Sequence, residues 1–261
     1  IRDLIVTGVQ TCALPISYEE YRSSIGKMAL NGVEATASMG IDTPLAVLSH
    51  EHQPLFNYFK QLFAQVTNPP IDCIREEIVT STSVYVGRDG NLLEEEPKNC
   101  QVLKINNPIL TNTDMLKIKN MKVEGFKAVT VPITYYKSAP LDRAMDRLFV
   151  EVDRAHRAGA NILILSDRGV DENHVAIPSL LAVSAVHQHL VKTKKRTSLA
   201  IILESGEPRE VHHFATLLGY GACAINPYLA LDTIHELIEE GMIKKRSEEH
   251  TSELQSRSDL V

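Results

Sequence analysis

The second half of the chain alternates short runs that are apolar throughout with longer amphipathic segments. The apolar runs are too short for helices and rich in Val, Ile and Leu, and they cover residues 127–134, 161–166, 198–203 and 222–225. The amphipathic segments carry apolar residues at helical spacing, and they cover residues 141–157, 179–192, 207–218 and 229–240. Wholly apolar strands alternating with helices are typical of parallel sheets buried on both faces. The pattern predicts an α/β fold of parallel βαβ units, with a partial or degenerate barrel-like architecture.

The first half of the chain has a weaker pattern. Residues 45–48 suit a short strand, and residues 55–66 (LFNYFKQLFAQV) suit an aromatic-rich amphipathic helix that ends before Pro69 and Pro70. Shorter segments at 73–79 and 113–119 are predicted to be helical, the second after an Asn/Thr-type cap.

The two ends of the chain differ from the middle. Residues 1–17 have no clean helical or strand periodicity, and residues 245–261 are rich in serine and charge. Both resemble translated sequencing-adapter tails, so we interpret them as non-native. Residues 18–244 then form the native part of the chain, which we expect to be a fragment of a longer protein.

Charge and cysteine content limit the classes of protein to which this chain can belong. The formal net charge of −6 argues against a chain-wide electrostatic attraction to nucleic acid. No apolar run approaches the roughly 20 residues that span a bilayer, so no membrane partner is expected. Four widely separated cysteines without a CxxC pair favour a reduced, cytoplasmic location.

Polar residues follow three of the predicted strands at the point where each strand ends. They are Asp167, Arg168, Glu204 and Asn226. The carboxyl ends of parallel strands face the ligand crevice in α/β folds, so these residues form a candidate polar site. The alternative is an internal ion-pair network, in which Asp167 or Glu204 pairs with Arg168 or Arg209. Without a cofactor motif in the sequence, the network is the favoured interpretation.

Motifs for other chemistry are missing. The sequence has no GxGxxG after a strand, no GxxxxGK[ST], no GxSxG and no HExxH. Glu210 and His213 have the i, i+3 spacing of an ExxH ligand pair, but a single pair is weak evidence for a metal. We therefore assign no catalytic, cofactor-binding or metal-binding residue.

Several long stretches, in one order, resemble the central domain of the glutamate synthase large chain. They lie at residues 40–49 (GIDTPLAVLS), 58–72 (YFKQLFAQVTNPPID), 162–169 (ILILSDRG), 177–186 (IPSLLAVSAV), 209–215 (REVHHFA) and 224–230 (AINPYLA). The resemblance spans essentially all of residues 18–244. It implies a parent oxidoreductase that converts glutamine, 2-oxoglutarate and reductant to two molecules of glutamate, using FMN and an iron–sulfur cluster.

In that family the central domain lies between an amidotransferase domain and an FMN domain, which are the partners that the resemblance implies. It is expected to space these domains and to help wall an ammonia tunnel, so the segment alone is predicted to be inactive. Thr67 and Asn68, in a proline-stiffened loop, are possible tunnel-lining residues, although they could equally end the preceding helix. The alternative function is a stand-alone α/β module that binds a small ligand.

Overall fold

The computed structural model describes most of the chain between Ile16 and Ile243. The described residues are 16–35, 46–48, 50, 53–61, 63–66, 69–91 and 93–243. Within this part of the chain, no helix combines the length and the apolarity that crossing a bilayer requires.

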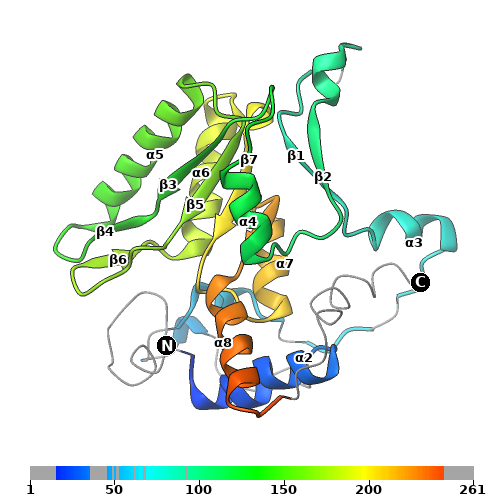
Figure 1. The fold of residues 1–261 in the computed structure, drawn as a ribbon, viewed down its shortest axis with the longest axis vertical. Coiled ribbons are helices and arrows are strands. Elements are labelled where there is room, and N and C mark those ends of the chain that lie inside the picture. Colours follow the sequence, from blue (N-terminus) through cyan, green and yellow to red (C-terminus); the bar gives the residue numbers. More distant parts are fainter. Residues whose placement is uncertain are drawn as a thin grey trace.

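The centre of the fold is an open, parallel, four-stranded sheet (Figure 1). Its strands are β3 (Ala128–Pro132), β5 (Ile162–Ser166), β7 (Ala200–Glu204) and β8 (Ala224–Asn226). The order of the strands in the sheet is the same as their order along the chain, so each crossover adds the next strand at the same edge. The predicted α/β class and parallel βαβ units are confirmed, and the sheet does not close into a barrel.

One face of the sheet packs against three crossover helices (Figure 1). These helices are α5 (Leu141–Arg157), α6 (Ser179–Lys192) and α7 (Val211–Gly219). Val131, Leu165, Leu203 and Ile225 lie in one register row across the strands, and all four belong to this apolar cluster. The helices turn their own apolar stripes toward this row, and their burial stabilises this layer.

The opposite face carries the alternate residues of the same strands. Ile164, Ile202 and Ala224 pack there against Met115 and Ile118 of α4 (Asn112–Lys119). Val86, in the antiparallel pair of β1 (Val84–Gly87) and β2 (Val102–Ile105), closes the same cluster. Both sheet faces are therefore covered, as the wholly apolar strands predict.

A third apolar cluster joins the start of the described chain to its end. The helical turn η1 (Glu20–Ile25) contributes Tyr21 and Ile25, and α8 (Tyr228–Glu239) contributes Leu237. Ala29 of α2 (Gly26–Asn31) packs against the same cluster. Ile16 is also buried in this cluster. The predicted boundary between residues 17 and 18 stays a prediction.

The remaining elements are short. An antiparallel pair, β4 (Thr134–Tyr136) and β6 (His174–Ala176), extends beyond the carboxyl ends of β3 and β5. The others are η2 (Ala46–Leu48), η3 (Leu55–Phe59), α3 (Cys73–Val79), η4 (Pro97–Cys100) and η5 (Arg196–Ser198).

Two predictions for the first half are wrong. The short strand expected at 45–48 is instead the 3-10 turn η2, and the helix expected at 55–66 is only the five-residue turn η3. Phe56 of η3 is fully buried and stacks on His213, with 4.3 Å between the ring centroids. Phe63 and Val66 are exposed, so neither of these side chains supplies an apolar contact that would stabilise a continuation of the helix beyond Lys60.

Helix α4 is fixed at its amino end by Thr111. The hydroxyl of this residue accepts a hydrogen bond from the Asp114 backbone N–H at 3.1 Å. Replacing Thr111 by alanine should lower the free energy of unfolding by about 1 kcal/mol, because one donor of the first turn loses its partner. Urea unfolding measures the loss. Thr113→Ala, at an exposed position of the same helix, is the matched control and should cause no comparable loss.

Candidate functional site

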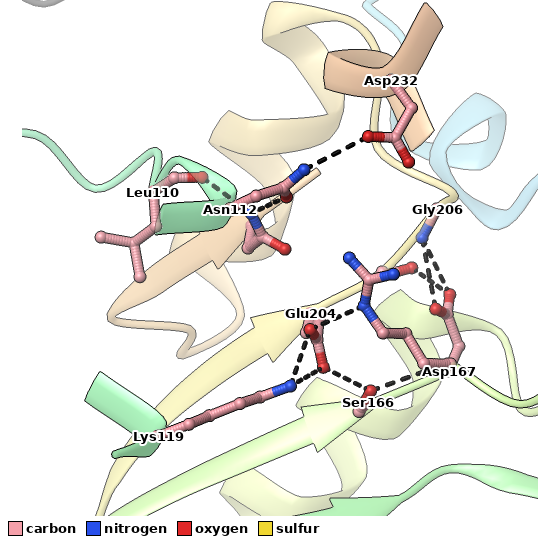
Figure 2. Close-up of polar contacts among 11 residues, drawn as sticks. Leu110, Asn112, Lys119, Ser166, Asp167, Glu204, Gly206 and Asp232 are labelled. Atoms are coloured by element: carbon pink, nitrogen blue, oxygen red, sulfur yellow. Dashed lines mark hydrogen bonds and ion pairs between the residues drawn. The ribbon is translucent and has the colours of Figure 1, made fainter. Parts of the chain in front are cut away.

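The polar residues predicted at the strand ends lie at the carboxyl edge of the sheet. The last register row contains Pro132, Ser166, Glu204 and Asn226, one residue from each strand. Side chains alternate between faces along a strand, so this row belongs to the face that α4 covers. Figure 2 shows the polar contacts around Ser166 and Glu204 of this row.

Glu204 is the centre of the cluster and is 2% exposed. Lys119, the last residue of α4, donates to both of its carboxylate oxygens, at 2.8 Å and 2.7 Å. The Ser166 hydroxyl donates to Oε2 at 2.6 Å, and Arg168 donates through Nε to Oε1 at 2.8 Å. One side chain from the end of α4 and two from the end of β5 or just after it therefore hold one buried carboxylate (Figure 2).

The charge of Glu204 is stabilised by these donors. Burial acts to raise the pKa of this carboxyl, but the hydrogen bonds from Lys119, Ser166 and Arg168 outweigh it and lower the pKa below its usual 4.5. The folded state therefore binds the proton less tightly than the unfolded state. The resulting stability is present above pH 4.5 and is lost as the pH falls through the lowered pKa.

A pH-dependent destabilisation by Glu204→Gln follows from this lowered pKa. The loss of unfolding free energy should be largest at neutral pH and should shrink as the pH falls through the lowered pKa, where the native carboxyl also becomes neutral. Urea unfolding over a series of pH values from neutral to acid measures it. Glu124→Gln, at an exposed position, is the control. A loss independent of pH would contradict the role of charge.

Asp167 has its own donors on the neighbouring loop. The Ser205 hydroxyl donates to Oδ2 at 2.6 Å, and the Gly206 backbone N–H donates to the same oxygen at 3.0 Å. Tyr228 also hydrogen-bonds to this carboxyl. Burial nevertheless dominates and raises the pKa of Asp167 above its usual value. Asp167 thus ties the end of β5 to the loop after β7.

Arg168 bridges two parts of the edge. Its Nε contacts Glu204, and its guanidinium carbon lies 4.0 Å from the centroid of the Tyr228 ring. This is the geometry of a cation–π contact. The side chain stays 46% exposed, so water screens part of its charge.

Asn226 connects β8 to the segment before α4. Its side-chain amide donates to the Leu110 carbonyl at 2.9 Å and to Asn112 Oδ1 at 3.0 Å. Asn112 in turn donates to Asp232 at 3.2 Å (Figure 2). Asn226 Oδ1 is buried and accepts no hydrogen bond from the described residues. The residue therefore acts as a link between backbone segments.

The geometry favours the internal network over an open polar site. Glu204 pairs with Arg168, as one form of the network predicts, while Asp167 is held by hydroxyl and backbone donors. The guanidinium of Arg209 pairs with Glu20 at 2.9 Å. Lys119 was missed by sequence reasoning. It lies 85 residues from Glu204 along the chain, and no local pattern marks it.

A cavity of about 330 Å³ lies beside the loop after β7. Lys60, Arg209, Glu207 and His213 are among the residues that line it. The Glu207 carboxylate accepts hydrogen bonds from the Ser179 hydroxyl and, at 2.8 Å, from its backbone N–H, which fixes the start of α6. Burial, assisted by the Arg209 charge, lowers the pKa of His213 to about 3, so this imidazole is neutral at physiological pH.

The described residues do not fit a metal or iron–sulfur centre. Cys73 and Cys100 are exposed, and Cys223 is half-buried before β8. Among the residues whose positions are described, no three His, Cys, Asp or Glu side chains gather as a ligand set. Thr67 and Asn68, the predicted tunnel-lining residues, lie outside the described residues.

Comparison with known families identifies the family of the chain. A family model described as the glutamate synthase central domain matches residues 10–258. The chain belongs to this family. The prediction of a glutamate synthase central domain is thereby confirmed, and the alternative of a stand-alone ligand-binding module is not favoured.

Curated relatives extend far beyond this central domain. The chain is 45% identical to the glutamate synthase [NADPH] large chain of Bacillus subtilis over 240 residues, 92% of this chain and 16% of that protein. It is 41% identical to the glutamate synthase [NADH] of Schizosaccharomyces pombe, over 92% of this chain and 12% of that protein. A ferredoxin-dependent glutamate synthase of Synechocystis is 40% identical over 87% and 15%, respectively. The chain thus spans less than a fifth of the length of each.

Proposed function

We propose that this central domain spaces the glutaminase and FMN domains of a glutamate synthase and helps wall the path of ammonia between them. The observation that carries this proposal is the carboxyl edge of the sheet. At this edge, where α/β folds place ligands, the Glu204 carboxylate is held by Lys119, Ser166 and Arg168 of the same chain. The edge is built for rigidity, which a spacer between two reaction centres needs.

A walled path has a chemical reason. Glutamine hydrolysis releases ammonia, and in neutral water most of it becomes ammonium, which is charged and not nucleophilic. A dry path keeps ammonia neutral and raises its effective concentration at the second centre, where it reacts with 2-oxoglutarate. The parent's FMN and iron–sulfur cluster belong, in this proposal, to other domains of the same polypeptide.

Thr67 and Asn68 are the proposed contributors to the path from this chain. They precede Pro69 and Pro70, which restrict the backbone of the loop and would hold the hydroxyl and the amide in place. Residues 18–244 are the proposed extent of the central domain.

Thr67→Val in a full-length synthase tests the tunnel role. We would use a chimaera in which this chain replaces the matching region of the Bacillus subtilis large chain. Loss of the hydroxyl should let ammonia escape, so glutamine hydrolysis should exceed 2-oxoglutarate consumption. Thr197→Val, at an exposed position of the described chain, is the matched control and should keep the two rates equal. Equal rates in Thr67→Val as well would remove the proposal for this residue.

A further inference from the structure

The segment that contains α3 lies outside the packed body of the fold. Before this segment, Phe56 belongs to the apolar cluster between the sheet and α5, α6 and α7, and Leu55 packs on that cluster. After it, Val84 packs on the cluster on the opposite face of the sheet. None of the described residues between 60 and 83 belongs to any of the three clusters. Figure 1 shows α3 standing apart from the sheet and its helices. This segment therefore connects two packed parts of the fold without packing in either.

Helix α3 is well formed at its start and carries an exposed apolar stripe. Asp72 caps it by accepting hydrogen bonds from the backbone N–H groups of Ile74 and Arg75, at 3.1 Å and 2.9 Å. Ile74 is 76% exposed and Ile78 is 73% exposed. Their i, i+4 spacing places them on the same side of the helix. Ile71, just before the cap, is also exposed.

An isolated helix of this length does not persist in water. α3 has seven residues, whereas isolated helices shorter than about 12–15 residues are marginal even for favourable sequences. Helices in proteins gain most of their stability by packing an apolar face, and the described residues offer no such packing for Ile74 and Ile78. A contact that stabilises α3 would therefore have to lie outside the described residues.

We propose that α3 docks into an apolar groove on another domain of the same synthase polypeptide. The exposed stripe comprises only a few residues, far below the roughly 20–30 per side of a stable interface between separate proteins. A covalently connected domain can use so small a contact, because tethering supplies a high effective concentration. The Bacillus subtilis relative has ample chain for such a domain, since this chain covers 16% of it.

The groove that receives α3 is apolar at its centre and polar at its rim. Ile74 and Ile78 fill the centre, in the manner of an amphipathic helix in a groove. Arg75 and Glu77 flank the stripe on its two sides. The rim of the groove is therefore polar on both sides, where it meets one positive and one negative side chain of α3. The proposal rests on the proposed function only in requiring that this chain is part of a longer synthase.

Hydrogen exchange of the α3 amides tests the docking. The backbone amides of residues 76–79 are compared in the 261-residue chain and in the chimaeric full-length synthase. We expect exchange in the synthase to be slower by at least about tenfold, because docking suppresses local opening. Equal exchange in the two proteins would overturn the proposal. Slowing that appears in the 261-residue chain as its concentration rises would also overturn it, in favour of a second copy.

A double variant assigns the protection to the apolar stripe. In the synthase, Ile74→Ser with Ile78→Ser should return exchange at residues 76–79 to the rate of the 261-residue chain. Amides of β5 and β7 should keep their protection, which shows that the fold is intact. Glu76→Gln, on the side of α3 away from the stripe, is the matched control and should retain the slow exchange. Retained protection in the double variant would contradict docking through this stripe. The stoichiometry of Thr67→Val is independent of this readout, so the two proposals fail separately.

Discussion

Replacing Glu204 by alanine should lower the free energy of unfolding by about 2–3 kcal/mol at neutral pH. The substitution removes the partner of Lys119 and Arg168 and leaves the Ser166 hydroxyl without its acceptor. Breaking a fully buried ion pair typically costs about 3–5 kcal/mol. The effect here should be smaller, because Lys119 and Arg168 keep part of their contact with water.

Urea unfolding of the 261-residue chain, followed by circular dichroism, measures this loss. Glu124→Ala removes an exposed carboxylate of the same type and should change the unfolding free energy by less than about 0.5 kcal/mol. If the two variants were equally stable, the Glu204 cluster would not be a structural element of the edge.

Leu165→Ala should lower the free energy of unfolding by about 3 kcal/mol. Leu165 is fully buried between Val131 and Leu203 in the register row that faces α5, α6 and α7. The substitution removes buried apolar atoms and leaves a cavity that a close-packed sheet can only partly fill.

The matched control for Leu165 is Leu116→Ala on the outer side of α4, where the side chain is 58% exposed. That variant should lose less than about 1 kcal/mol, because little apolar surface returns to water. Comparable losses at the two positions would contradict a core centred on this face of the sheet.

Local patterns predicted the second half of the fold well. The helices α5 and α6 begin and end at the residues that their periodicity indicates, and β5 and β7 begin and end within two residues of the apolar runs. These segments are regular because both sheet faces are buried, so pattern and packing agree. The helix predicted at 55–66 failed because, among the described residues of this segment, only Phe56 is fully buried.

The candidate site was predictable only in part. Asp167, Arg168, Glu204 and Asn226 could be located because strand order places strand ends at one edge. Lys119 could not, because α4 reaches Glu204 only through the packing of the second sheet face. The Glu20–Arg209 pair joins residues 189 positions apart and likewise depends on tertiary structure.

The proposed role as a rigid wall requires that no residue of this domain takes part in a bond-breaking step. Its most direct test is Glu204→Gln in the chimaeric full-length synthase, with thermal unfolding and the rate of glutamate formation measured on the same sample. A lower unfolding temperature, with kcat unchanged within about twofold, is the expected result. A fall in kcat of about a hundredfold or more at unchanged thermal stability would contradict the account, because it would place Glu204 in the chemistry itself.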